Sequence, residues 1–244
     1  MSGHSKWSTI KRQKQANDQA RGKVFTKLAN AITLSVREGG GIADPLTNVK
    51  LRFAVDKAKA ANMPRINIER AIDRAMGKGD DHQLEEVLYE GFGPLGIAVL
   101  AEGVTDNKQR TVASVRNIFA THGGNLGQSG SVVYLFTKAG EMRVRKTLPV
   151  DTIFDIIATH GALDLEEIED AFIITTPADK MHEIRIAIEK ANGIVEESEL
   201  IYSPTSEVFI SDKENSEKIL GFLQALDDVD DIHKIHTNAK IQSP

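Results

Sequence analysis

The spacing of apolar residues changes once along the chain, near residue 80, and this change limits the folds that the chain can adopt. Before it, apolar residues recur at three- and four-residue steps, as in Phe25, Leu28, Ile32 and Val36. That spacing is typical of amphipathic helices. After it, short apolar runs alternate with glycine-rich turns and further helical stretches. The sequence therefore predicts a helical N-terminal domain followed by α+β structure.

Glycines and prolines divide the first 80 residues into three helical stretches. Gly39–Gly41 ends the first stretch, because glycine adopts the left-handed conformation without penalty. Asp44-Pro45 is predicted to begin the second as N-cap and first helical residue, and Asn62-Met63-Pro64 separates the second from the third. Residues 48–76 would fit a helix-turn-helix, but any three-helix bundle contains such a junction, so both interpretations stay open.

A short internal sequence repeat indicates how the chain after residue 80 is organised. Residues 118–126 read IFATHGGNL and residues 156–165 read IIATHGALDL. The second copy belongs to a complete β-α-β-β-α-β succession, provided that a short strand forms near Ile168; this succession is the ferredoxin-like split unit. The first copy lacks its second half, which the strand–helix–strand pattern of the C-terminus can supply.

We therefore predict an α+β fold: an N-terminal all-helical domain followed by two ferredoxin-like α+β domains, one inserted in the other. The predicted domains are a basic helical domain over residues 1–80, a discontinuous α+β domain over 81–136 and 205–244, and an inserted α+β domain over 137–204. In the discontinuous domain, strands are expected at Ile97–Leu100 and Val132–Phe136. Taken separately, its two pieces would be too small to bury a good core.

The net charge of −5 conceals two regions of opposite sign. Residues 1–80 carry 16 Lys+Arg and 7 Asp+Glu, a net +9, whereas the remaining residues carry 14 and 28, a net −14. A basic end on an acidic body determines which end approaches a polyanion. This distribution of charge favours a contact at one end of the protein over non-specific coating of the polyanion.

The first 28 residues hold seven Lys and Arg, one acidic residue (Asp18) and the only tryptophan, Trp7. A nucleic acid offers phosphates to the cations and base faces to the indole. A solvated tail or a surface helix with extended lysines explains the same composition, and composition alone does not separate the two.

Other protein classes find little support in the sequence. The absence of cysteine excludes disulfides, thiolate metal sites and a cysteine nucleophile, and it fits a reducing cytoplasm. No apolar stretch approaches the ~20 residues that span a bilayer. Catalytic and dinucleotide-binding motifs are absent, so we expect no enzyme, no cofactor and no membrane partner. His233 and His236 are predicted to point to opposite faces of a strand, which argues against a shared metal.

The glycine-rich segment 123–130 has backbone N–H groups that could cradle a phosphate. It follows a helix and precedes a strand, the reverse of a nucleotide-binding loop, so a turn is favoured. Arg110 and Arg116 on the preceding helix would add an anion contact, although solvated positions are favoured. His122 and His160 each precede glycine at a helix end, where the helix dipole favours imidazolium.

Several ordered motifs resemble the YebC-type family of probable transcriptional regulators. They are GHSKW at residues 3–7, Ile10-Lys11, RGKVFTKL at 21–28, Asp44-Pro45, Asn62-Met63-Pro64, IERAI at 68–72, Tyr89-Glu90-Gly91, Thr105-Asp106-Asn107 and GGNLG at 123–127. The match is strong over about residues 2–136. Over the remaining residues, the resemblance rests on the pattern of apolar residues and on the length of the chain. Two departures stand out. Arg12-Gln13-Lys14 replaces the usual His-Arg-Lys order, and Ile66 replaces an acidic residue.

The resemblance implies a cytoplasmic DNA-binding regulator with a helical first domain and two α+β domains. Relatives also include mitochondrial translational activators and ribosome-associated factors, so RNA or the ribosome is the second target. A protein partner on the acidic domains is a further expectation. The residues expected to contact nucleic acid are Lys6, Trp7, Lys11, Arg12, Lys14, Arg21, Lys23, Lys27, Arg70 and Arg74.

Overall fold

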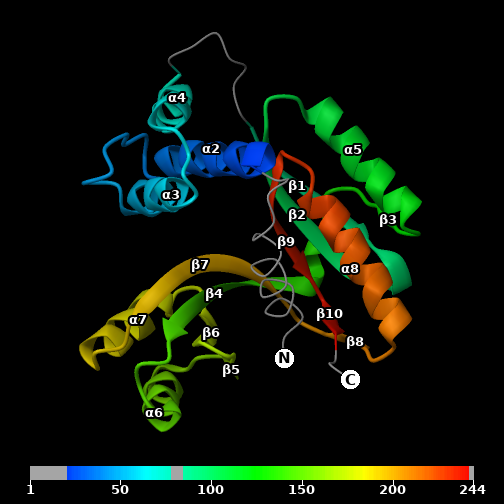
Figure 1. Cartoon of the computed structure of the whole chain (residues 1–244). Coiled ribbons are helices and arrows are strands. Elements are labelled where there is room, and N and C mark those ends of the chain that lie inside the picture. Colours follow the sequence, from blue (N-terminus) through cyan, green and yellow to red (C-terminus); the bar gives the residue numbers. More distant parts are fainter. Residues whose placement is uncertain (1–20, 78–84, 242–244) are drawn as a thin grey trace.

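The computed structural model describes residues 21–77 and 85–241, with side chains from Val24 onward (Figure 1). The N-terminal helices are α2 (Arg21–Glu38), α3 (Val49–Ala60) and α4 (Arg65–Ala75). Their shared core is formed by Leu28, Ile32, Val36, Leu51, Val55, Ala58, Met63, Ile68 and Ala71. The predicted apolar stripe of the first helix therefore lies inside this three-helix cluster.

The start of α3 differs from the prediction. Asn48, not Asp44, is the N-cap: its side chain accepts a hydrogen bond from the Leu51 N–H at 3.0 Å. The same buried amide donates to the carbonyls of Ser35 and Ile42, each at 2.9 Å. Asp44 instead accepts from the Leu46 N–H in the preceding turn. Asn48 is preferred because it satisfies three backbone groups at once.

The discontinuous domain contains a four-stranded antiparallel sheet in the order β3-β1-β2-β9. Its elements are β1 (Glu85–Phe92), the 3-10 turn η2 (Pro94–Gly96), β2 (Ala98–Thr105), α5 (Lys108–Thr121), β3 (Asn125–Leu126), α8 (Lys213–Asp227) and β9 (Ile232–Thr237), with a parallel pair of β8 (Val208–Ile210) and β10 (Ala239–Ile241). Helices α5 and α8 cover one face of this sheet (Figure 1). There the rings of Phe119 and Phe222 meet edge to face, with centroids 5.0 Å apart.

The inserted domain forms a second four-stranded antiparallel sheet in the order β5-β6-β4-β7. Its elements are β4 (Phe136–Arg145), α6 (Val150–His160), β5 (Asp164–Glu167), β6 (Ala171–Pro177), α7 (Met181–Lys190) and β7 (Val195–Pro204). This is the β-α-β-β-α-β order, and β5 is the short strand expected near Ile168. The predicted α+β fold class is confirmed.

The expected strand at Val132–Phe136 is wrong. Val133–Leu135 forms the 3-10 turn η3, and β4 begins at Phe136 and runs without interruption into the inserted domain. The reason is the buried carboxylate of Glu90, which accepts from the N–H groups of Gly130, Val132 and Val133 at 2.7–2.9 Å. Because these N–H groups are occupied, they cannot pair with a neighbouring strand.

Candidate nucleic-acid interface

Most of the N-terminal cations in the predicted interface cannot be placed. Lys6, Trp7, Lys11, Arg12 and Lys14 lie outside the described residues, and Arg21 and Lys23 lie in the first turn of α2, where side chains are not described. Their contact with nucleic acid stays a prediction. The structure places the side chains of Lys27, Arg70 and Arg74.

Lys27 faces the acidic body of the molecule. Its ammonium lies 3.1 Å from Asp227 Oδ1 and also donates to the Asp227 backbone carbonyl. The two side chains are only 21% and 11% exposed. Lys27 therefore joins α2 to the end of α8, and this ion pair already uses its positive charge.

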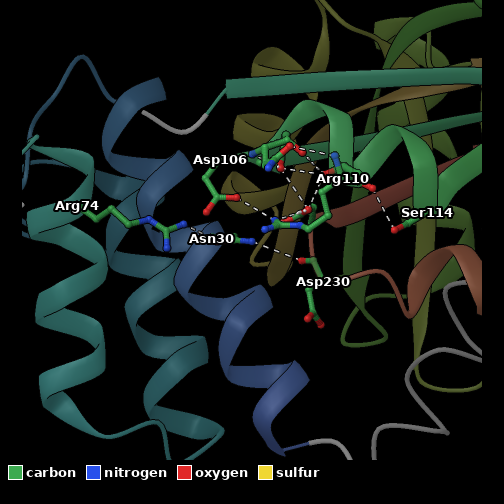
Figure 2. A network of polar contacts seen from close by, with 10 residues as sticks. Asn30, Arg74, Asp106, Arg110, Ser114 and Asp230 are labelled. Atoms are coloured by element: carbon green, nitrogen blue, oxygen red, sulfur yellow. Dashed lines mark hydrogen bonds and ion pairs between the residues drawn. The ribbon is translucent and has the colours of Figure 1, made fainter. Parts of the chain in front are cut away.

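Arg74 also points toward the body, as Figure 2 shows. Its Nη2 donates to Asn30 Oδ1 at 2.9 Å, and Asn30 Nδ2 reaches the backbone carbonyl of Asp230 at 3.4 Å. Nε of Arg74 is buried and has no hydrogen-bond partner within the described chain. Arg74, expected to contact nucleic acid, is therefore directed toward Asn30 and not outward.

Arg110 belongs to a neighbouring cluster on the body side of this junction (Figure 2). Its Nη2 lies 2.8 Å from Asp106 Oδ1 and 3.0 Å from Asp231 Oδ2. Hydrogen bonds to these carboxylates, first of all Asp231, raise the pKa of Arg110. Asp231 also accepts from the Thr111 hydroxyl at 2.6 Å. The acidic turn between α8 and β9 therefore anchors α5 as well as the helical domain, which leaves Arg110 little capacity for an external anion.

A groove between α2 and α4 remains open. It has a volume of about 300 Å³ and is lined by Phe25, Thr26, Ala29, Met63, Asn67, Arg70, Ala71 and Arg74. We call these residues the α2–α4 groove. Arg70 is exposed, and no described residue forms an ion pair with it. The groove thus combines an apolar floor with a guanidinium that is available to a ligand.

The chemistry of the α2–α4 groove suits an anion with a flat group attached. A guanidinium offers several N–H donors in a planar fork, which matches two phosphate oxygens. The half-buried ring of Phe25 supplies an aromatic surface, and the amide of Asn67 adds a donor and an acceptor. Sequence reasoning missed Phe25 and Asn67, because Phe25 counted as one more core residue of the apolar stripe.

The glycine-rich segment and the two histidines at helix ends have internal partners, whereas Arg116 is exposed. The glycine-rich segment closes on Glu90, so its N–H groups at Gly130, Val132 and Val133 hold a carboxylate of the chain itself. The Nδ1 atoms of His122 and His160 lie 2.9 and 2.7 Å from the carbonyls of Ile118 and Ile156. Within residues 21–77 and 85–241, no group of three or more His, Asp or Glu could hold a metal. None of the described helices is long and apolar enough to cross a membrane.

Comparison with known proteins identifies the family. The TACO1/YebC N-terminal domain matches residues 5–78, and the TACO1/YebC second and third domain matches residues 84–239. A probable transcriptional regulatory protein of Desulforapulum autotrophicum is 46% identical over 243 residues, covering 99% of this chain and 97% of the relative. A protein of the same name from Persephonella marina is 43% identical, covering 98% and 95%. The crystal structure of a conserved hypothetical protein from Aquifex aeolicus is similar, with a TM-score of 0.79, 38% identity and 93% coverage of both chains. The chain therefore belongs to the TACO1/YebC family.

Proposed function

We propose that this protein is a cytoplasmic, non-enzymatic regulator of transcription that binds DNA through its basic helical domain. The observation that carries the proposal is the α2–α4 groove, where the exposed Arg70 lies beside an apolar floor and has no ion-pair partner among the described residues. The names of the relatives, probable transcriptional regulatory proteins, support the same role.

The distribution of charge supports an end-on mode of binding. Residues 1–80 carry a net +9 and the remaining chain a net −14. Because Lys27 contacts Asp227 and Asn30 contacts Asp230, the helical domain is attached to the acidic body by its inner side. The body repels a polyanion, so only the outer side of the helical domain and the basic N-terminal residues approach the phosphates. Arg74 would contribute by holding α4 against α2.

RNA, alone or in the ribosome, is the second candidate target, and Phe25 favours it. An aromatic ring in a groove stacks on an unpaired base, which duplex DNA does not offer but RNA loops do. Both targets use the same electrostatics. Co-sedimentation with ribosomal particles, set against protection of a narrow site on duplex DNA, separates them.

The first test replaces Lys11, Arg12 and Lys14 with alanine, with and without Arg70→Ala. We expect weaker binding to a fluorescent duplex at low salt, because each lost phosphate contact reduces counterion release. The melting temperature should stay nearly unchanged. A control that replaces Lys190, Lys213 and Lys218 in the acidic body removes the same charge as the triple variant and should bind as the wild type.

A large fall in the melting temperature of the first variant would show that the segment is structural. Equal weakening by the control would show that net charge alone, not the helical domain, governs binding. Either result would overturn the proposal.

A further inference from the structure

The outer face of α3 combines exposed apolar side chains with exposed cations. Val49 and Phe53 lie on this face and are 47% and 53% exposed, and Leu46, in the turn before the helix, is 83% exposed. Arg52 and Lys57 flank them, and no described residue forms an ion pair with either. Val49 and Phe53, four residues apart, form an exposed apolar stripe on one face of the helix.

The outer face of α6, in the inserted domain, has the same apolar spacing and the opposite charge. Val150 and Phe154 are four residues apart and 42% and 58% exposed. Asp151 and Asp155 lie beside them, also four apart, and no ion pair with a described residue engages either carboxylate. Within one molecule the two stripes do not cover each other, because both phenylalanine rings are more than half exposed.

We infer that the α3 face of one copy docks on the α6 face of a second copy, so that the protein associates head to tail. The two faces are complementary in both spacing and charge. Val49 and Phe53 match Val150 and Phe154 in spacing and character, while Arg52 and Lys57 meet Asp151 and Asp155. The α3 face also carries Asp56, but this carboxylate lies 3.9 Å from Lys59, so Arg52 and Lys57 remain as its excess charge. Contact of two α3 faces would bring these excess cations together, and contact of two α6 faces would place carboxylates against carboxylates, so self-pairing of either face is disfavoured.

This arrangement has a consequence for assembly. A head-to-tail contact uses two different surfaces, so each copy in a growing chain keeps one free α3 face and one free α6 face. Association therefore continues beyond two copies as the concentration rises, unless a ring closes. Because two short helix faces bury little area, the contact is reversible and concentration dependent.

The test measures the mass of the full-length protein by sedimentation at increasing concentration and low salt. We expect the mean mass of the wild type to rise with concentration and to fall again in high salt. Phe53→Asp and Phe154→Asp should each remain monomeric. An equimolar mixture of the two variants should form a dimer and stop there, because one copy keeps an intact α6 face and the other an intact α3 face.

Tyr134→Asp is the matched control, since it removes an aromatic side chain that is even more exposed, at 68%, from the discontinuous domain. It should associate as the wild type does. Melting curves confirm that each variant is folded. A wild type that stays monomeric at every concentration, or a mixture of the two phenylalanine variants that forms no dimer, would overturn the inference.

Discussion

The two α+β domains share one strand order but differ in where their polar groups lie. In both sheets the spatial order of the strands is that of a β-α-β-β-α-β unit. In the discontinuous domain, however, β1 comes first in the sequence but occupies the place of the third strand of that unit. The inserted domain has an apolar core of residues such as Met142, Ile153 and Ile184. The discontinuous domain buries several polar side chains, among them Glu90, Thr105, Thr111, His236 and Asn238, whereas the inserted domain buries Thr176 alone among its described polar side chains.

The buried polar groups join segments that are distant in the sequence. Asn238 Oδ1 accepts from the Ala98 N–H at 2.7 Å, and His236 Nε2 lies 2.5 Å from Glu102 Oε1. Thr111 binds Asp231. Bringing together two pieces of chain that are distant in the sequence costs more loop-closure entropy than folding one continuous segment. Directional hydrogen bonds then determine how the C-terminal piece packs against the first piece. The strands and helices of the inserted domain all come from one continuous segment of the chain.

The largest effect is expected at Glu90. Glu90→Ala leaves three backbone N–H groups without their carboxylate partner, and each unsatisfied buried group costs about 1–3 kcal/mol. Since two of these groups are partly exposed, we expect a total loss of about 3 kcal/mol in the free energy of unfolding, measured in urea. Glu86→Ala, at an exposed position of the same strand, is the control and should change little.

A loss below about 0.5 kcal/mol for Glu90→Ala, within the range of ordinary surface substitutions, would contradict the role given to this carboxylate. It would also remove the explanation for the turn at Val133–Leu135.

The second effect is pH dependence at His236. Nδ1 accepts from the Tyr202 N–H at 3.3 Å, so Nε2 carries the proton that faces Glu102. Burial lowers the pKa of His236, and the hydrogen bond to Glu102 opposes this without cancelling it. Burial by itself raises the pKa of Glu102. The hydrogen bond to His236 and the nearby cations lower this pKa by more than burial raises it, so the net pKa lies below the usual value and the carboxyl stays ionised.

Because the folded pKa of His236 lies below the unfolded value, the unfolded state binds the proton first as the pH falls. The stability contributed by the neutral imidazole is complete above about pH 6.5 and is lost below it, by at most about 1.4 kcal/mol per pH unit. Urea titrations between about pH 5 and 8 should show this slope in the wild type. His182→Gln, at an exposed site, should retain the slope and His236→Gln should reduce it; an unchanged slope in the second variant would exclude His236 as the cause.

The smallest effect is expected at Arg143 in the inserted domain. Its guanidinium lies 2.9 Å from Glu196 and 2.5 Å from Asp170. After Arg143→Ala, Glu196 keeps Arg145 at 2.8 Å and Asp170 is exposed, so no carboxylate is left buried alone. We expect a loss of about 1 kcal/mol in unfolding free energy. A loss of unfolding free energy as large as that of Glu90→Ala would contradict the view that polar contacts stabilise the discontinuous domain more than the inserted domain.

The fold was predictable where one local pattern determined it. The apolar stripe of α2 and the echoed Thr-His-Gly segments led to the helical domain and to the ferredoxin-like topology. Errors arose where a distant side chain decides the local structure. Asn48 replaces Asp44 as the cap because it also reaches Ser35 and Ile42, and the apolar run at Val132–Phe136 bends because Glu90 binds its N–H groups.

The candidate interface was predictable only in part for the same reason. Arg70 is exposed as expected, but Lys27 and Arg74 face the body. Lys27 pairs with Asp227, 200 residues further along the chain, and Arg74 binds Asn30, which in turn reaches the backbone carbonyl of Asp230. Helical periodicity shows which residues point away from the core of their own domain. It does not show which of them meet a second domain.

The central claim is that the helical domain binds nucleic acid through phosphate contacts. The most direct test is the affinity of the wild-type protein for labelled duplex DNA across a range of salt concentrations. If about six cations engage phosphates, log K should fall against log[salt] with a slope near −5. A slope indistinguishable from zero, or no binding at low salt to either DNA or RNA, would contradict the account.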